Sequence, residues 1–328
     1  MVTSTGSETA TLHSFAAARQ FDLDWYPGIR GDETNRYHRL AKPTLYDAAL
    51  ALLGPGRSAF LGGYSFNIWP ATDERPFFFR FFKWSLLPQL ATLRGQGGLV
   101  FVDAGYLVVV LALLQAIIAS AILILLPLVW IRGGEAGRAQ PGRVRVAFYF
   151  LLIGLAFLSV EIAFIHRFSP FLGHPLAAIS VTLASFLVSA GLGSGISKRV
   201  AARWPEAAVT LAVVGIVGLG AIYAIGLPPL FSVLMGVPLP VKIAVVISLL
   251  APLGFVMGLP FPLGLARVSA CAPHLVPWAW GINGCASVVA AVMASLLAMH
   301  IGFTALLALA LGLYTATPLL LGRSQPAA

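Results

Sequence analysis

Acidic and basic side chains gather near the end of one apolar segment, residues 146–165. Glu161 lies inside this segment, and His166, Arg167 and His174 follow shortly after it. An acidic side chain within a membrane helix is costly and usually faces a cavity or a partner. At the helical rise of 1.5 Å per residue, Glu161 lies about 7–8 Å from His166. The four residues are therefore a candidate polar cluster, suited to a proton relay or to an anion or substrate site.

A purely structural role for the cluster is the alternative, with Glu161 and Arg167 forming an ion pair that fixes the helix end. One glutamate and two histidines without tight ligand spacing are weak evidence for a metal, so no metal site is expected. Cys271 and Cys285 stand fourteen residues apart outside any CxxC pattern, and both are expected to be packing residues.

Three prolines mark a second candidate region. Pro252, Pro260 and Pro262 fall within or at the end of the apolar segment 241–265, where each removes a backbone donor and favours a helix break. Broken membrane helices free backbone groups that can bind a substrate or an ion. Asn283, in the next apolar segment, could join such a site as a candidate intramembrane polar residue. Its alternative role is a hydrogen bond between helices.

Signatures of enzymes are absent from the sequence. It contains no GxSxG, HExxH, GxxxxGK[ST] or CxxC pattern, so no catalytic residue and no cofactor-binding residue is assigned. Residues 191–195 (GLGSG) resemble a dinucleotide loop, but they close an apolar segment instead of following a strand. Small residues four apart, such as Gly191 with Gly195 and Gly254 with Gly258, favour close packing between helices.

The elements that must position these residues are membrane helices. Hydrophobic residues make up 59% of the 328 residues and charged residues 10%, against about 25% charged residues in soluble proteins. A helix needs about 20 apolar residues to cross a bilayer, so the sequence predicts seven membrane-spanning helices. They are 105–131, 146–165, 175–197, 207–227, 241–265, 277–299 and 303–322, with residues 299–302 (MHIG) dividing the last two.

The net charge of +9 follows the pattern of membrane topology and gives no indication of nucleic-acid binding. The segments that connect or follow the predicted spans lie alternately on the two sides of the membrane. Those on one side hold nine Lys and Arg residues, whereas those on the other hold only Arg167 and Lys242. The first side is expected to be the cytoplasm. Seven spans would then place residues 1–104 on the outer side.

The first third of the chain is a small mixed piece that holds ten basic and nine acidic residues. Helices are expected at 8–19 and 45–53, and a half-buried strand at 21–26 (FDLDWY). Residues 76–84 carry six aromatic side chains around Arg80 and Lys83, a composition suited to the lipid–water interface or to a buried strand or lid. The fold class is mainly α: an α/β remnant at 1–75, an aromatic interfacial linker at 76–104 and a membrane helix bundle at 105–328.

Several of these stretches resemble bacterial membrane-bound spermidine synthase-like proteins. In those proteins a methyltransferase-fold domain meets a membrane region, and residues 71–79 (ATDERPFFF) with 82–84 (FKW) look like that junction. Stretches similar to the membrane region follow over residues 150–154 with Glu161, 172–175, 189–194, 258–264 and 280–284. The likeness extends from about residue 15 to residue 320.

The resemblance implies an aminopropyltransferase- or methyltransferase-like domain beside a polytopic membrane domain. The part that would bind S-adenosylmethionine or its decarboxylated form is missing, since residues 15–60 resemble only the tail of such a domain. This chain is therefore not expected to be active alone. It would be a C-terminal fragment or one half of a split protein, and no cofactor is expected unless a complete catalytic domain is supplied elsewhere.

The sequence favours the membrane portion of a spermidine synthase-like protein, which anchors or serves a methyltransferase-fold catalytic domain. A self-contained transporter of a small, cationic solute and a purely structural membrane subunit are the alternatives. The expected partners are the lipid bilayer and an upstream methyltransferase-fold domain or subunit, without nucleic acid. The expected location is the bacterial cytoplasmic membrane.

Overall fold

A computed structural model describes residues 6–37, 39–78, 80–86, 104–122, 126 and 141–321. The chain divides into two compact units, which are described separately. Unit 1 comprises Met1–Pro70 and Phe78–Asp103, and unit 2 comprises Ala71–Phe77 and Ala104–Ala328. The seven residues Ala71–Phe77, here called the junction segment, group with the helix bundle. The expected boundary after residue 75 falls inside this segment.

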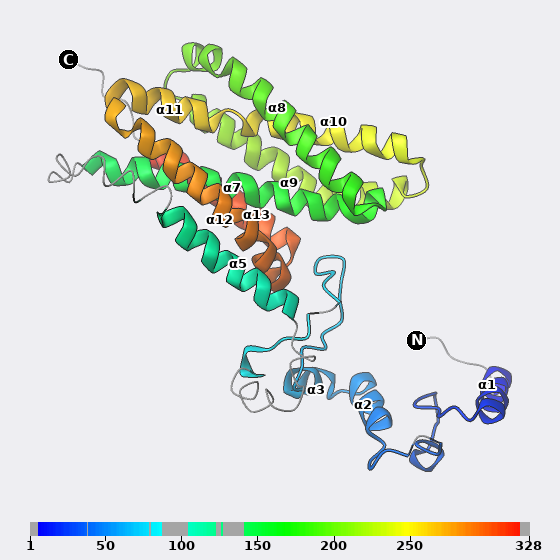
Figure 1. Cartoon of the computed structure of the whole chain (residues 1–328). Helices are drawn as coiled ribbons and strands as arrows, with labels where there is room; N and C mark the ends of the chain where they lie inside the picture. Colours follow the sequence, from blue (N-terminus) through cyan, green and yellow to red (C-terminus); the bar gives the residue numbers. More distant parts are fainter. Residues whose placement is uncertain are drawn as a thin grey trace. The chain divides into compact units, whose positions relative to one another are not determined.

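Unit 2 is a bundle of long apolar helices (Figure 1). Six helical stretches are long and apolar enough to cross a membrane. They are formed by α7 (Pro141–Leu172), α8 (Pro175–Arg203), α9 (Ala208–Leu234), the pair α10 (Leu239–Met257) and α11 (Pro260–Cys271), α12 (Val276–Ile301), and α13 (Phe303–Leu320). A short 3₁₀ turn, η5 (Pro273–Leu275), leads into α12.

The six-helix core matches six of the seven expected spans in position. The first expected span, 105–131, corresponds to α5 (Ala104–Ser120), whose 17 residues fall short of the length of a full crossing. Much of the remainder of that span lies outside the described residues. Seven spans therefore remain a prediction, whereas a multi-pass helical architecture is present.

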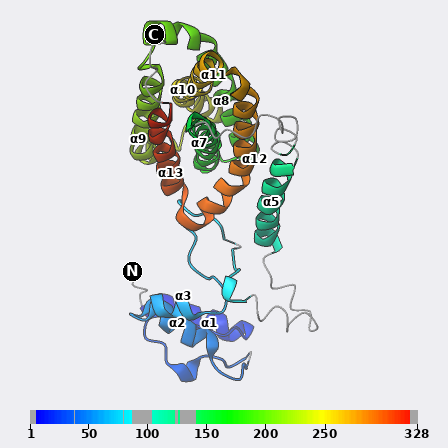
Figure 2. The ribbon, with the colours of Figure 1, turned by 90° about the vertical axis from the view of Figure 1, so that its left-hand side faces the viewer.

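Helix α7 occupies the centre of the bundle. Viewed along the bundle, α8, α9, α10, α12 and α13 surround it, and α5 lies outside α12 (Figure 2). Its side chains Tyr149, Phe150, Ala156 and Val160 have no exposed surface. The apolar periphery of the other helices faces outward, as expected where lipid is the solvent.

The turn between α12 and α13 divides the long uncharged stretch where the sequence predicts. α12 ends at Ile301 and α13 begins at Phe303. Between them Gly302 adopts φ +86°, a conformation that side chains with a Cβ rarely take. A Cβ here would also lie 3.3 Å from the carbonyl oxygen of Glu74 in the junction segment.

Unit 1 consists of short helices: α1 (Gly6–Arg19), α2 (Thr44–Leu53) and α3 (Arg57–Gly63), with 3₁₀ turns η1 (Gly31–Glu33) and η2 (Trp84–Leu86). The helices expected at 8–19 and 45–53 are thus present. The described residues contain no β-strand, so the strand expected at 21–26 is wrong. That segment has no regular secondary structure and no pairing partner among the described residues, and a strand requires such a partner for stability. The α/β character of residues 1–75 is not confirmed.

Unit 1 buries few apolar side chains. Among its described residues, the buried apolar side chains are Ala16, Leu61 and Phe82, whereas large apolar residues of α1 and α2 are exposed, for example Phe15, Leu45 and Leu53. The described residues of unit 1 thus form only a small apolar core.

Candidate functional site

The junction segment is bound to the end of the bundle where α7 ends and α13 begins. One Glu74 carboxylate oxygen accepts hydrogen bonds from the Thr304 hydroxyl at 2.8 Å, and the other accepts from the Thr304 backbone N–H at 2.9 Å. Arg167 of α7 completes this arrangement, because its Nη1 lies 3.6 Å from Glu74 Oε1 and donates to Thr304 Oγ1 at 2.9 Å. Glu74, Arg167 and Thr304 are here called the junction clamp.

The junction clamp provides hydrogen-bond acceptors for backbone N–H groups at the start of α13. The first backbone N–H groups of α13 have no partner within the helix, and a carboxylate at this position also interacts favourably with the helix dipole. The Glu74 carbonyl accepts a further bond from the Phe303 N–H at 3.2 Å. Two consecutive N–H groups of α13 are thus bonded by one residue of the junction segment.

Aromatic packing lies beside the clamp. The His166 ring stacks on Phe303 with 4.8 Å between ring centroids, and Phe77 of the junction segment contacts both rings. His300, at the end of α12, hydrogen-bonds through Nε2 with the Tyr106 hydroxyl of α5 at 3.1 Å. The junction segment, α5, α7, α12 and α13 therefore meet at this end of the bundle.

The structure does not assemble the expected four-residue cluster. Arg167 and His166 lie at the junction clamp, and no ion pair joins Arg167 to Glu161 in the described part of the chain. His174 is exposed at the N-cap of α8, with no described contact to the other three residues. Glu161 is deeply buried in α7, where its Oε1 has no hydrogen-bond partner. No group of three His, Cys, Asp or Glu residues within the described ranges could hold a metal ion.

The expected helix break is found between α10 and α11. Pro252 lies inside α10, whereas Pro260 and Pro262 stand in the first turn of α11, where a missing N–H is tolerated. The Tyr149 hydroxyl of α7 donates to the Pro260 carbonyl at 2.6 Å. A carbonyl at this break is therefore bonded within the protein.

Asn283 lies half-buried on α12, against α7. A Cβ on Gly154 would come within 2.8 Å of the Asn283 carbonyl oxygen and 3.0 Å of its side-chain oxygen. The position is one of close helix packing, in keeping with the role between helices that the sequence leaves open. Trp280, three residues earlier on α12, packs against Phe261 at the start of α11, with 4.7 Å between ring centroids.

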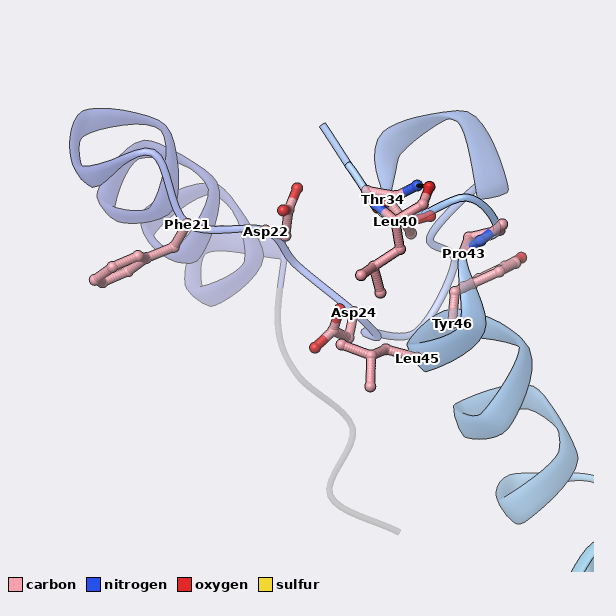
Figure 3. A pocket seen from close by; sticks show the side chains of 9 residues that line it. Phe21, Asp22, Asp24, Thr34, Leu40, Pro43, Leu45 and Tyr46 are labelled. Atoms are coloured by element: carbon pink, nitrogen blue, oxygen red, sulfur yellow. Dashed lines mark hydrogen bonds between the residues drawn. The ribbon is translucent and has the colours of Figure 1, made fainter. Parts of the chain in front are cut away.

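Unit 1 contains a half-open pocket with a volume of about 430 Å³. Its walls include Asp22 and Asp24 from the extended segment after α1, and Leu45 and Tyr46 from the start of α2 (Figure 3). The Asp22 carboxylate already accepts the backbone N–H groups of Arg36 and Tyr37, at 2.6 and 3.0 Å.

A tyrosine–carboxylate pair lies near this pocket. The Tyr26 hydroxyl donates to Glu33 Oε2 at 2.5 Å. This hydrogen bond is the main cause that lowers the pKa of Glu33 and raises the pKa of Tyr26. It fixes the loop around η1.

The aromatic linker also contributes to unit 1. Lys83 Nζ donates to the carbonyls of Leu61, Gly62 and Tyr64 at 3.3, 2.9 and 2.7 Å, and so caps the C-terminus of α3. Phe78 and Trp84 are exposed, whereas Phe82 is buried.

Sequence patterns alone missed Glu74, Thr304 and Tyr149 as positioning residues. Glu74 lies in the stretch that carries the family resemblance, but nothing in its spacing relates it to α13. The chain matches no protein-family model, no curated protein and no solved structure.

Proposed function

We propose that this chain is the integral membrane portion of a spermidine synthase-like protein, located in the bacterial cytoplasmic membrane. It would anchor or serve a methyltransferase-fold catalytic domain that this chain does not contain complete. The junction clamp is the observation that carries the proposal, because it fastens to the bundle the segment that resembles the family's domain junction.

The position of the junction segment in the sequence also fits an anchoring role, because this segment divides unit 1 into two stretches of chain. Residues on both sides of Ala71–Phe77 belong to unit 1, while the segment itself belongs to unit 2. Unit 1 is thus tied to the bundle through three chain connections, two of them at the ends of the junction segment and the third between residues 103 and 104. Hydrogen bonds and an ion pair restrain the junction segment.

The small core of unit 1 also supports the proposal. Apolar side chains of α1 and α2 remain exposed, as expected for part of a larger domain whose remaining elements would cover them. That remainder would hold the adenosyl cofactor.

The test begins with the reading frame that precedes Met1 in the genome. We expect it to encode a methyltransferase fold, and we expect its product to co-purify with the full chain from detergent-solubilised membranes. Membranes that contain both products should transfer an aminopropyl group from decarboxylated S-adenosylmethionine to a diamine, and membranes with either product alone should not. An unrelated neighbouring frame, or a related product that never co-purifies, would overturn the proposal.

A self-contained transporter receives less support. The polar residues expected to line its pathway are not together, because His166 and Arg167 lie at the junction clamp and Glu161 lies inside the bundle. Arg167 is bound to Glu74 and Thr304. Uptake of a radiolabelled polyamine into vesicles that contain only this chain would favour the transporter over the anchor. A purely structural subunit would show neither uptake nor dependence of aminopropyl transfer on the chain.

A further inference from the structure

Glu161 is the acidic residue in the interior of the bundle. Its side chain belongs to the central helix α7 and is 4% exposed. Its Oε1 has neither solvent contact nor a hydrogen-bond partner in the described residues. A carboxylate that is ionised in such surroundings would lose its hydration without compensation.

Aromatic side chains surround the level of Glu161. Phe186 of α8 contacts Phe157 and Phe164, at 6.4 and 6.1 Å between ring centroids. These two phenylalanines lie four residues before and three residues after Glu161 on α7, so Phe186 lies level with Glu161. Phe164 also meets Tyr223 of α9, whose hydroxyl is already bonded to the Leu249 carbonyl at 2.6 Å.

Helix α8 contributes hydroxyl groups at the same depth. Thr182 stands one turn before Phe186, has no exposed surface, and its Oγ1 also lacks a partner. The neighbouring Ser185 donates its proton to the Val181 carbonyl at 2.6 Å, which leaves its oxygen able to accept. Two buried polar groups without partners, one on each of two adjacent helices, thus lie within about one helical turn of each other along the bundle.

No described counter-charge compensates Glu161. On α7 itself, Arg167 is held in the junction clamp. Lys242 of α10 lies over the Phe171 ring near the helix end, and Arg267 of α11 bonds the carbonyls of Pro205 and Glu206. The other titratable or charged side chains on α7 and the helices around it are Arg143, Arg145, Tyr149, His166, Lys198, Arg199, Arg203, Tyr223, Cys271, Cys285, His300 and Tyr314.

A proton is the cation that fits this site. Calcium takes six to eight oxygen ligands, and magnesium takes near-octahedral coordination. The described part of the chain offers no group of three His, Cys, Asp or Glu side chains for either ion. Protonation, in contrast, removes the charge without further ligands and turns the carboxyl into a hydrogen-bond donor.

We propose that Glu161 is an intramembrane proton-binding site, protonated at neutral pH, and that the Thr182 hydroxyl, which is not hydrogen-bonded to it in the structure, is the second polar group of the site. One proton binds one carboxylate oxygen and leaves a neutral carboxylic acid in the bundle. The nearer aqueous end is the end of α7 at Leu172, eleven residues or about 16 Å from Glu161. The site is independent of the anchor function, because the junction clamp does not include Glu161.

A hydrophobic carbodiimide tests the site directly, since it converts protonated carboxyl groups in apolar surroundings into stable N-acylureas. The full chain in lipid vesicles is treated with dicyclohexylcarbodiimide at about pH 7, where an exposed glutamate is ionised. Mass spectrometry of peptides should then find the adduct on Glu161 and not on Glu206, an exposed glutamate between α8 and α9. E161Q should abolish the adduct, and E206Q should not.

Infrared spectroscopy provides a second measurement that needs no reagent to reach the site. The spectrum of the wild-type chain minus that of E161Q should contain the carbonyl band of one protonated carboxylic acid at neutral pH. If this band is absent and Glu161 is not labelled, the proposal is overturned. Labelling of Glu206 to the same extent as Glu161 would also contradict it.

Thr182→Val tests the neighbouring hydroxyl. The pH midpoint of Glu161 labelling should shift in this variant, because it removes the buried hydroxyl group that lies within about one helical turn of Glu161. Ser248→Ala is the matched control, since Ser248 is exposed on α10 and bonds within its own helix, to Ala244. An unchanged midpoint in Thr182→Val would remove Thr182 from the site.

Discussion

At the residue scale, Arg167 has a different partner from the one that its sequence neighbours indicate. An ion pair with Glu161, six residues earlier, is one prediction from the sequence. In the structure the guanidinium pairs with Glu74 of the junction segment, and its side chain is only 12% exposed. The Glu74 side chain is 48% exposed, so the pair is shielded on the arginine side only and its contribution is close to that of a surface ion pair, about 0–1 kcal/mol.

Glu74→Ala should lower the stability of the bundle, because it removes both the carboxylate that caps α13 and the partner of Arg167. The expected loss is about 1 kcal/mol, the usual cost of losing a helix cap. Thermal unfolding in detergent can be followed by a thiol-reactive dye at the buried Cys285, with the exposed Cys271 replaced by serine. Asp73→Ala is the control and should leave the transition unchanged.

Tyr26→Phe should raise the pKa of Glu33, since its hydrogen bond is the main cause that lowers it. Because the pKa of Glu33 is lowered in the folded state, the hydrogen-bonded pair stabilises the loop at pH values above the ordinary glutamate pKa of about 4.3. That stabilisation is lost as the pH falls through the lowered pKa. The pKa of Tyr26 is raised, so the stabilisation that depends on the protonated Tyr26 hydroxyl is lost only as the pH rises through that raised pKa.

Carboxyl carbon NMR of selectively labelled glutamate measures this titration. Tyr37→Phe is the matched control, because the bond of Tyr37 to Asp22 comes from its backbone N–H. A midpoint for Glu33 that is the same in Tyr26→Phe and in the wild type would contradict the prediction.

At the element scale, glycines decide how closely α8 and α10 pack. A Cβ on Gly193 would overlap the Phe255 carbonyl oxygen, and a Cβ on Gly258 would overlap the Ala190 carbonyl oxygen. Gly191 and Gly195, which the sequence pattern also indicates, have open space around them. The pattern therefore identifies the correct stretch of α8 but not the glycine in contact.

Gly193→Ala and Gly258→Ala should each destabilise the bundle by about 1–3 kcal/mol, because backbone atoms of the facing helix must move apart. Gly191→Ala and Gly195→Ala are matched controls and should be neutral or slightly stabilising. The same dye-based unfolding assay compares the four variants. Equal losses in all four would mean that α8 packs through another face.

Tyr149→Phe should loosen the contact between α7 and the start of α11. The variant leaves the Pro260 carbonyl without the Tyr149 donor, at a cost of about 0.6 kcal/mol for an average hydrogen bond in a membrane protein. Hydrogen exchange of the first turn of α11 should become faster, while exchange in α13 stays unchanged. Faster exchange throughout the bundle would indicate a general packing defect instead.

At the scale of the whole molecule, charge is distributed unequally between the two ends of the bundle. The end where α7 begins and α8 ends carries Arg143, Arg145, Lys198, Arg199, Arg203 and Arg267 in the described residues. The opposite end carries Arg167 and Lys242 on its helices, together with Arg75 of the junction segment. The positive-inside rule therefore predicts that the first end faces the cytoplasm and that the end with the junction clamp faces the outer side. A catalytic domain that uses an adenosyl cofactor is expected in the cytoplasm, so the anchor proposal requires the reverse orientation.

Cysteine accessibility tests this orientation in a variant with Cys271 and Cys285 replaced by serine. His174→Cys, at the exposed α7–α8 turn, should react with a membrane-impermeant maleimide in intact spheroplasts. Glu206→Cys, at the opposite end, should react only after the membrane is permeabilised. The reverse pattern would invert the predicted topology.

The sequence by itself determined the membrane helices, their approximate bounds and the turn at Gly302, because apolar runs, prolines and glycines act locally. The tertiary structure alone decided which residues meet. Glu74 reaches Thr304, Arg167 turns away from Glu161, and Tyr149 reaches Pro260, because these contacts join residues far apart in the chain. The expected strand at 21–26 failed for the same reason, since alternation can propose a strand but only a pairing partner stabilises one.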